Sequence, residues 1–363
     1  MLDKSKVAVI TTDAKSILDD VERAFKLGEA FKALSQQSPV ILKDNITWHL
    51  PFLSANTTPW QLEGSIKWLK KNRYDMLAVH NDTVVTNPYI GLKNLKLQEV
   101  YDAYQIKQYF VNDPKSVAWE SSQLKAQTPS LDKIYKDQLS FPALFKNKNI
   151  VHLPTVKTHV YTKTTGAVKN SFGGLLNTKR HYCHTYIHGV LADLVAVQKE
   201  LHSGIFAIAD GTLAGNGAGP RTMTPVEKNI LIASSDSVAM DAVAARLMGF
   251  NPIDIPYLRE CAERGLGNIE NNKIELVGDD IEGNWNFKLK NNFVSAVGNT
   301  LWFSPMRFIQ NLFFKTPLVH GFIKGSSYFH DDYWWHRHGR KRMKNVENKS
   351  QWGKLFRDYT PNP

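Results

Sequence analysis

The chain has 363 residues, 42% of them hydrophobic and 11% aromatic, which is typical of a globular protein with one large or two modest domains. Its two cysteines, Cys183 and Cys261, exclude a disulfide framework, a four-thiolate metal site and a cysteine-ligated iron–sulfur cluster. The formal net charge of +11 favours anionic partners. We expect a cytoplasmic protein, because the sequence shows no signal peptide and no apolar run long enough to span a membrane.

The first 80 residues alternate between short apolar runs and helical patterns. Strands are expected at residues 6–12, 39–43 and 75–80, and helices at 17–34 and 58–69. Thr58 and Pro59 are typical of a helix start, with threonine as the cap and proline at the first helical position. This order of elements predicts an α/β fold, in which a mostly parallel sheet is flanked by helices.

The rest of the chain continues this pattern after a polar, poorly periodic excursion at residues 111–149. Further strands are expected at 149–153, 204–209 and 275–278, and further helices at 180–201, 235–248 and 252–263. We predict an α/β region over residues 1–295, either as one unit or as two lobes, 1–148 and 149–295. Residues 296–363 are expected to form an aromatic and basic C-terminal arm that packs onto the body or onto a partner.

Residues 152–193 hold five of the twelve histidines, together with several lysines and two adjacent glycines. Lys157 and His159 are expected just past a strand end, where the ligands of parallel α/β sheets gather. A lysine there can bind an oxyanion, and a histidine can transfer a proton. The alternative is a surface turn with a solvated lysine.

Lys169 and Asn170 follow in a segment that contains several glycines, residues 166–174. Glycines let main-chain N–H groups approach an anion closely, so these two side chains are candidate ligand contacts. The segment lacks the phosphate-loop signature, so its pattern does not indicate phosphate in particular. It is equally typical of two turns that end helices.

His181, His184 and His188 have the i, i+3, i+7 spacing that places side chains on one face of a helix. The pair His184 and His188 can reach one metal ion, although the zinc-protease signature is absent because no glutamate follows His184. The same histidines are candidates for acid–base or ligand contacts, or for a polar face bonded to backbone and water. Asp193 lies off this face and can orient one of them only indirectly.

Asp210 ends a predicted strand and precedes a glycine-rich loop that contains Gly217 and Gly219. A carboxylate at a strand end beside such a loop is well placed for a substrate or ion contact. The glycines do not match the pattern of a nicotinamide dinucleotide site. A long hairpin or loop with a purely structural role is the alternative.

Asp236 and Asp241 belong to one predicted helix but differ in setting. Asp236 lies in the first turn, where a carboxylate suits the helix dipole. Asp241 lies among alanine and methionine, where a carboxylate is costly unless it is paired. We therefore expect an ion pair between Asp241 and one of the nearby cations, Lys157, Lys169 or Arg180.

Several short motifs occur in an order that resembles the domain of unknown function 362 family over about residues 6–280. They are LKDN, TTP, LPTVKTH, TGAVKNSFGG, ADG, GAGP, SSDSVAMDAVAARLMG and GLG. The resemblance implies a largely uncharacterised family, some of whose members carry a ferredoxin-type domain whose cysteines this chain lacks. It also implies a fold distantly similar to nickel-dependent lactate racemase, which uses histidines and lysine around a 2-hydroxy acid. In the LKDN motif, Asp44 stands where the family usually has proline. This replacement is expected either to loosen the turn at the motif or to add a carboxylate to the site.

Our first hypothesis is an enzyme that uses lysine and histidine acid–base chemistry on a small anionic substrate, either as an isomerase or racemase or in association with an oxidoreductase. The substrate would bear a carboxylate or a phosphate. The candidate catalytic residues are Lys157, His159, His184 and His188. The candidate substrate contacts are Lys43, Asn45, Lys169, Asn170, Arg180, Asp210, Gly217, Gly219 and Asp241. The cofactor is left open; a divalent transition metal would use His184 and His188.

Two alternatives remain open. A binding or assembly protein would dock on nucleic acid, a membrane surface or another protein through residues 302–344. The basic run at 336–344 within this region is also typical of a solvated surface. A redox partner protein would need a cofactor that the sequence does not identify.

Overall fold

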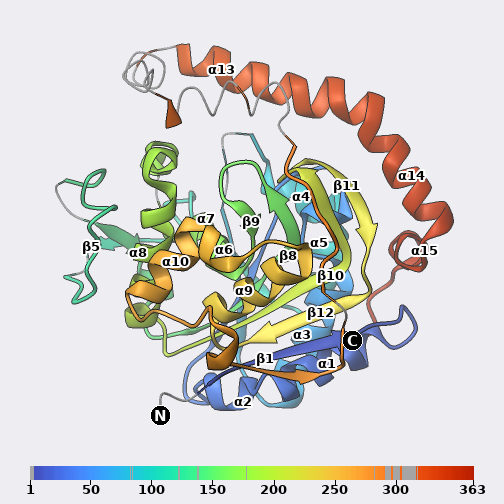
Figure 1. Ribbon diagram of the computed structural model, residues 1–363, viewed down its shortest axis with the longest axis horizontal. Coiled ribbons are helices and arrows are strands. Elements are labelled where there is room, and N and C mark those ends of the chain that lie inside the picture. Colours follow the sequence, from blue (N-terminus) through green and yellow to red (C-terminus); the bar gives the residue numbers. More distant parts are fainter. Residues whose placement is uncertain are drawn as a thin grey trace.

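The computed structural model describes residues 4–81, 83, 85–121, 123–136, 139–176, 178–281, 283–290, 296, 303–304, 316 and 318–363, with the backbone alone at 178–181 and 319. A large mixed sheet runs through the centre and carries helices on both faces (Figure 1). This architecture confirms the predicted α/β class. Within the described residues, no helix is both long and apolar enough to cross a membrane.

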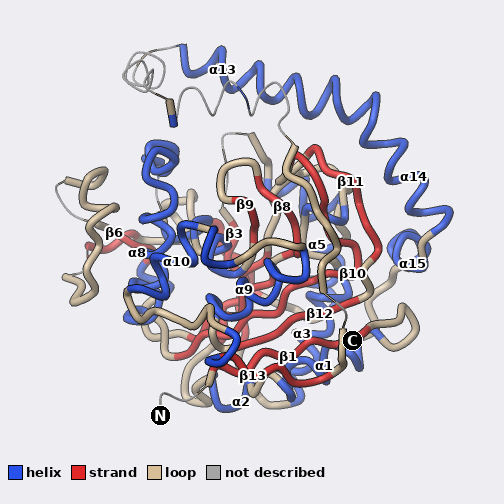
Figure 2. Tube along the Cα trace, in the orientation of Figure 1, coloured by secondary structure: helices blue, strands red, loops and turns tan. Residues whose placement is uncertain are grey.

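The main strands of the sheet follow one another in a defined spatial order (Figure 2). They are β13 (Ile274–Gly278), β1 (Ser5–Thr11), β12 (Ile230–Ser234), β10 (Gly204–Ala218), β7 (Asn149–Leu153), β2 (Val40–Asp44), β3 (Met76–His80) and β4 (Lys107–Phe110). From β10 to β4 all neighbours are parallel, whereas β12 is antiparallel to both of its neighbours. The carboxyl ends of β7, β2, β3 and β4 therefore meet at one edge of the sheet.

Three short strands extend the sheet beside β10. They are β8 (Thr155–His159), β9 (Lys163–Thr165) and β11 (Thr222–Glu227). β8 runs parallel to β10 and pairs with β9, and β11 forms an antiparallel hairpin with the second half of β10. The excursion at 111–149 holds a separate two-stranded sheet, β5 (Trp119–Ser121) and β6 (Ser140–Pro142).

The strand expected at residues 204–209 continues to Ala218, so the glycine-rich loop predicted from Asp210 onward is wrong up to that residue. The alternative, a long hairpin, is confirmed, and Gly219 lies in its turn. The glycines serve the close packing of β10 in the sheet. A side chain at Gly215 would overlap the sulfur of Met223 in β11 and would crowd the Cβ atom of Lys157 in β8. Local sequence alone reads such glycines as a loop, because the neighbouring strands that require them are distant in sequence.

One face of the sheet is covered by α1 (Ile17–Leu27), α2 (Ala30–Ala33), α3 (Pro59–Lys71), α4 (Pro88–Asn94) and α5 (Leu97–Ala103). The helix predicted over 17–34 is split, because Glu29 adopts a left-handed conformation with φ of 59°. The start of α3 is as predicted: the hydroxyl of Thr58 accepts a hydrogen bond from the main-chain N–H of Gln61, and the side-chain oxygen of Gln61 accepts one from the main-chain N–H of Thr58.

The other face is covered by α6 (Ala167–Asn170), α7 (Phe172–Leu175), α8 (Ile187–Leu201), α9 (Ser237–Met248) and α10 (Pro256–Glu263). Short 3₁₀ helices are η1 (Leu53–Ala55), η2 (Ala143–Phe145), η3 (Thr178–Tyr186), η4 (Pro252–Asp254) and η5 (Asn271–Lys273). Strand β1 contributes side chains to the hydrophobic core on each face of the sheet. Ala8 and Ile10 pack on one face, and Val7 and Val9 pack on the other.

The described part of the C-terminal arm packs on the body from about Phe329 onward. It comprises α13 (Leu318–Ser327), a π-helix (Tyr328–Gly339), α14 (Arg340–Lys349) and α15 (Gln351–Asp358). Trp334 and Trp335 lie with ring centroids 5.9 and 5.5 Å from Trp48, and the fully buried Trp352 lies 5.5 Å from Trp60. Residues 305–315 of the arm lie outside the described residues.

A buried carboxylate in α3 fixes the end of the arm. Glu63 accepts hydrogen bonds from the hydroxyl groups of Tyr104 (2.9 Å) and Tyr359 (2.5 Å) and from the main-chain N–H of Asn362 (2.8 Å). Burial and this carboxylate both raise the pKa of the Tyr359 hydroxyl, so the phenol stays protonated and remains a donor.

We predict that Glu63→Leu lowers the free energy of unfolding by about 3 kcal/mol, because the buried hydroxyl of Tyr359 and two partly buried donors lose their acceptor. Tyr359→Phe removes only one of the three donors and should cost about 1 kcal/mol. Denaturant unfolding measures both values. Equal stability of Glu63→Leu and the unmodified protein would contradict this role of the carboxylate.

Candidate functional site

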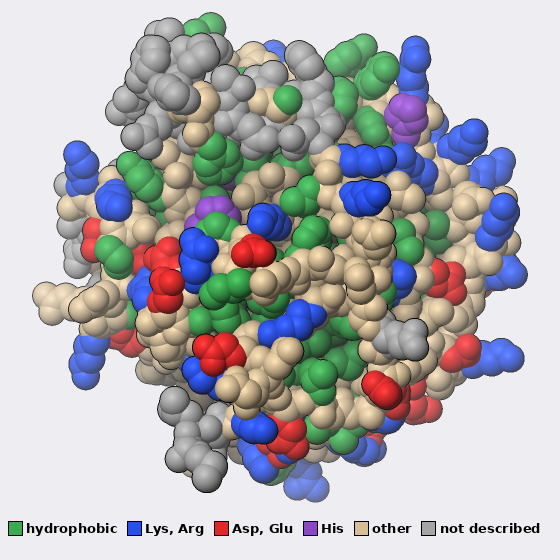
Figure 3. Space-filling model, in the orientation of Figure 1, with side chains coloured by type: hydrophobic (Ala, Val, Ile, Leu, Met, Phe, Trp, Pro, Cys, Tyr) green, Lys and Arg blue, Asp and Glu red, His purple; other side chains and the backbone are tan. Residues whose placement is uncertain are grey.

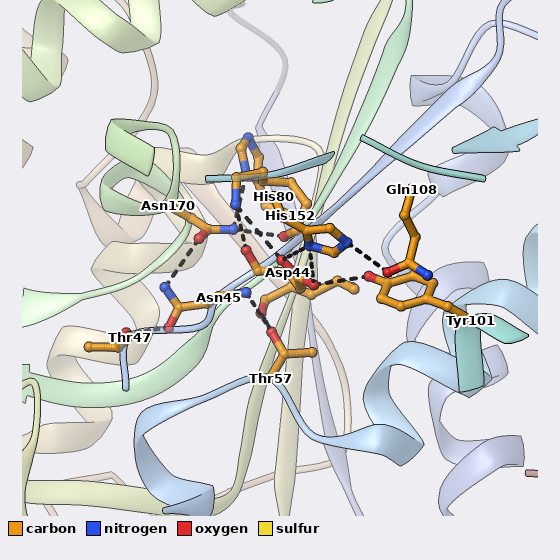
Figure 4. Close-up of polar contacts among 11 residues, drawn as sticks. Asp44, Asn45, Thr47, Thr57, His80, Tyr101, Gln108, His152 and Asn170 are labelled. Carbon is orange, nitrogen blue, oxygen red and sulfur yellow. Dashed lines mark hydrogen bonds and ion pairs between the residues drawn. The ribbon is translucent and has the colours of Figure 1, made fainter. Parts of the chain in front are cut away.

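Polar side chains gather where the parallel strands end (Figure 4). Asp44, at the end of β2, lies 3.0 Å from Nδ1 of His80, at the end of β3, and accepts a hydrogen bond from Tyr101 at 3.0 Å. Burial opposes the charge of Asp44, but the attraction of His80 and Lys43 outweighs it and lowers the pKa of the carboxyl. The carboxylate that replaces the family's proline is thus bound within the protein.

Two asparagines connect this network to α6. The side-chain oxygen of Asn170 accepts a hydrogen bond from Asn45 at 3.2 Å, and its amide nitrogen donates to the carbonyl of Lys43 at 2.9 Å. The same amide lies 3.3 Å from Nδ1 of His152, whose Nε2 lies 2.6 Å from Gln198. Burial lowers the pKa of His152 to about 3, so its ring is neutral and helps to position Asn170.

Lys157 is fully buried within β8 and not just past a strand end as predicted. Its ammonium donates to the side chains of Asn45 (2.7 Å) and Thr47 (3.2 Å) and to the carbonyl of Ala55 (2.5 Å). All three acceptors are uncharged. Burial, together with the charge of Lys169, lowers the pKa of this lysine well below its ordinary value.

His159 and Lys169 each have a polar group, Nε2–H and the ammonium respectively, that forms no hydrogen bond among the described residues. Nδ1 of His159 accepts the main-chain N–H of Tyr161 at 3.1 Å, so the neutral ring carries its proton on Nε2. Burial and the charge of Lys169 hold the pKa of His159 well below its ordinary value. Lys169 lies 5.7 Å from the ring centre of Phe172 and has no hydrogen bond or ion pair among the described residues. Burial lowers its pKa to about 8.

The histidine helix differs from the prediction. Residues 178–186 form a 3₁₀ helix and α8 begins only at Ile187, so the three histidines do not lie on one face of a single α-helix. His184 packs on the rings of Tyr161 and Phe172, near His159. His188 instead stacks on Tyr257 with a centroid distance of 6.4 Å, and burial lowers its pKa to about 4.

A metal ion at His184 and His188 remains a prediction. No group of three or more potential ligands from histidine, cysteine, aspartate and glutamate occurs among the described side chains. The Nδ1 atom of His188 is buried and has no hydrogen-bond partner among the described side chains and main chain. The side chains of Arg180 and His181 lie outside the described residues, so their predicted roles are not placed by the structure.

Asp210 and Asp193 are held by donors of the protein. Asp210 accepts hydrogen bonds from Thr58 (2.5 Å), the indole of Trp60 (3.1 Å) and the main chain of Thr212 (2.7 Å). It therefore fixes the start of α3 against β10. Asp193 accepts hydrogen bonds from two main-chain N–H groups and from Arg264, and it forms no hydrogen bond with a histidine among the described residues.

Asp241 has main-chain partners where we expected a cation. Its carboxylate accepts the N–H groups of Ala167 (2.8 Å) and Val168 (3.1 Å), and the hydroxyl of Tyr257 lies at 3.4 Å. No ion pair of Asp241 occurs among the described side chains. Two donors at the start of α6 take the place of the expected lysine, and burial raises the pKa of the carboxyl to about 7.

The two candidate glycines pack the β10–β11 hairpin against β8. The N–H of Gly217 donates to the hydroxyl of Thr158 at 3.0 Å, and Gly217 has a φ of +123° that favours glycine. A side chain at Gly219 would overlap the carbonyl of Thr158. Both glycines thus support the strand that carries His159, next to Thr158.

Arg221 and His49 were missed by sequence reasoning. One terminal nitrogen of Arg221 and Nδ1 of His49 are buried and have no hydrogen-bond partner in the described part of the chain. Both side chains interact electrostatically with Asp331 of the arm. Burial lowers the pKa of Arg221 to about 10, against the influence of Asp331 and Tyr161. The only local signal was the position of Arg221 directly after the GAGP motif.

The fold and the site define an α/β protein with a buried polar network at the carboxyl ends of its parallel strands. The chain belongs to the family described as domain of unknown function (DUF362), whose model matches residues 40–246. The predicted family membership is therefore confirmed.

Two known proteins show further similarity. A thylakoid-associated protein of Synechocystis sp. is 30% identical over 122 residues, which are 32% of this chain and 37% of that protein. The chain thus spans little more than a third of that relative's length. A crystal structure of a Thermotoga maritima protein aligns with a TM-score of 0.36 and 9% identity, over 54% of this chain and 50% of that one.

We predict that Gly166→Ala disturbs this site. The added methyl group would overlap the carboxylate of Asp241, which holds the start of α6 and with it Lys169 and Asn170. The free energy of unfolding should fall by about 2 kcal/mol or more. Gly325→Ala, in open space on helix α13, is the control and should be neutral or slightly stabilising. Similar stability of the two variants would show that Gly166 is not sterically required.

Proposed function

We propose that this protein is an enzyme that binds a small anionic substrate and transfers a proton to or from it. The observation that carries the proposal is the group of basic side chains around β8. Lys169 lowers the pKa of both Lys157 and His159 by charge repulsion, in a setting where burial already disfavours positive charge. Such a cluster is costly unless an anion neutralises it.

The neighbouring carboxylates do not supply that negative charge. Asp210 is bound by the start of α3, and Asp241 by the start of α6. Asp44 pairs with His80. A bound carboxylate or phosphate is the simplest partner for the ammonium of Lys169, which has no hydrogen bond or ion pair among the described residues.

The two open groups suit different tasks. With a pKa of about 8, Lys169 is mostly charged at neutral pH and can hold the anion. His159 is neutral and presents Nε2–H, so it can donate a hydrogen bond or a proton to a substrate oxygen. Lys157, Asn45 and Asn170 hold β8 and α6 in place around them.

A direct test is proton exchange in D₂O, followed by proton NMR, for a panel of lactate, malate and glycerol 3-phosphate. We expect exchange at a carbon-bound hydrogen of at least one compound. His159→Gln should lower the exchange rate by about a hundredfold while the compound still binds. Unchanged exchange in this variant would remove His159 from the mechanism, and a panel that neither binds nor exchanges would contradict the proposal.

The pH dependence of binding tests Lys169. Because the ammonium is lost above its pKa, affinity for the anion should fall as the pH rises through about 8. Lys169→Arg keeps the charge and should bind equally well at pH 7 and 9.5. Titration calorimetry measures both proteins. The same pH dependence in the arginine variant would show that another group controls binding.

A second candidate function is docking on an anionic membrane surface. Arg340, Lys341 and Lys344 of α14 are exposed, whereas Met343 and Val346 of the same helix are buried against the body. This leaves a basic outer face on a fixed helix. The thylakoid association in the name of the Synechocystis relative makes a membrane surface the partner to test.

Cosedimentation with phosphatidylglycerol vesicles tests this second function. Replacing Arg340, Lys341 and Lys344 by glutamine should weaken binding by about tenfold or more, because each basic residue contributes roughly 1 kcal/mol at an anionic surface. Replacing Lys107, Lys146 and Lys199 by glutamine changes the net charge equally and is the control. Equal loss in both variants, or no binding by the unmodified protein, would exclude this docking face.

A further inference from the structure

The geometry points to a second anion site, outside the proposed active site, that takes a small sugar phosphate. It is a pocket of about 320 Å³ between the β10–β11 hairpin, residues 286–290 and the C-terminal arm. It is lined by Asn216, Gly217, Ala218, Thr222, Thr224, Asn286, Lys288, Lys290, Trp334 and Arg342. The lining shares only Gly217 with the candidate substrate contacts, and it includes neither Lys169 nor His159, so we infer that its ligand is separate from the substrate proposed above.

The charge of the pocket is positive. Lys288, Lys290 and Arg342 contribute cations, and no acidic residue is part of the lining. None of the three forms an ion pair within the part of the chain that the structure describes. Lysine and arginine side chains also gather on the surface over the hairpin and the arm, at the upper right of Figure 3. An anion that enters the pocket therefore meets uncompensated positive charge.

The guanidinium of Arg342 and the main chain of Lys288 are held in place by contacts around the pocket. The guanidinium of Arg342 lies 5.1 Å from the ring centre of Trp334 and donates to the carbonyl of Met223 in β11. The main-chain N–H of Lys288 donates to the side chain of Asn216 in β10 at 3.0 Å. The hairpin thus fixes both the arm and residues 286–290, and a preformed site loses less entropy on binding.

Phosphate is the anion that best matches this arrangement. Three cations exceed the single charge of a carboxylate, whereas a phosphate monoester carries close to two charges at neutral pH. Arginine binds phosphate through a planar pair of donors, and lysine adds a point charge.

The rest of the lining favours a polar organic body. Asn216, Asn286, Thr222 and Thr224 offer amide and hydroxyl groups, and apolar surface comes mainly from Ala218 and Trp334. The volume lies at the lower end of the range for small-molecule pockets, roughly 300–1,000 Å³. A sugar phosphate of five or so carbons has both the size and the hydrogen-bonding groups for such a space.

Titration calorimetry of the full chain with ribose 5-phosphate, inorganic phosphate and ribose tests the proposal. We expect saturable binding of ribose 5-phosphate, weaker binding of inorganic phosphate and none of ribose. The double variant Lys288→Gln, Lys290→Gln should bind ribose 5-phosphate about tenfold more weakly or worse, a loss of about 1.4 kcal/mol. Lys146→Gln, Lys199→Gln has the same net charge and should bind within about twofold of the unmodified protein.

The variant Lys169→Ala distinguishes this pocket from the proposed active site. Ribose 5-phosphate should bind to this variant as tightly as to the unmodified protein. Loss of binding in Lys169→Ala alone would place the anion at the active site and overturn the inference. Equally weakened binding of ribose 5-phosphate in both double variants would show that the effect comes from the net charge of the protein and not from this pocket. Inorganic phosphate binding as tightly as ribose 5-phosphate would overturn the sugar-phosphate assignment, and no saturable binding up to about 10 mM would overturn the site itself.

Discussion

The need of one buried ammonium for acceptors organises the candidate site. Lys157 is fully enclosed in β8, and its donors reach Asn45, Thr47 and Ala55. These acceptors draw the segment after β2 against β8, and Asn45 in turn holds Asn170 at the end of α6. Lys169 is the neighbour of Asn170, so its position depends on this chain of contacts. One buried side chain thus sets the position of several polar groups of the candidate site.

The parts of the fold that depend on local signals could be predicted from sequence. Apolar runs indicated β1, β2, β3 and β7, and the cap formed by Thr58 indicated the start of α3. The length of β10 could not be predicted, because its glycines are required by packing against β8 and β11, which are distant in sequence. Likewise, nothing in the helical pattern of residues 180–201 indicated that the first part is a 3₁₀ helix.

The sequence indicated which residues belong to the candidate site, but it did not indicate their contacts. The segment around Lys157, His159 and Lys169 was found because these residues are close together in sequence and flank a strand. The partners of Asp241 were missed, since a buried carboxylate is satisfied by main-chain donors as well as by cations, and composition does not distinguish the two. The meeting of His49, Arg221 and Asp331 joins three distant segments, which only the tertiary fold brings together.

The three hydrogen bonds to Glu63 have a consequence for the order in which parts of the chain can fold. The carboxylate of Glu63 belongs to a helix near the start of the chain, but two of its three donors follow 296 and 299 residues later. While the chain is synthesised, α3 therefore presents an acid on a surface whose final cover does not yet exist. The native sheet and its helices can approach their places early, but burial of this face must wait for the arm. The arm thus acts as a late closing step of folding, and an incomplete chain keeps an open, charged flank.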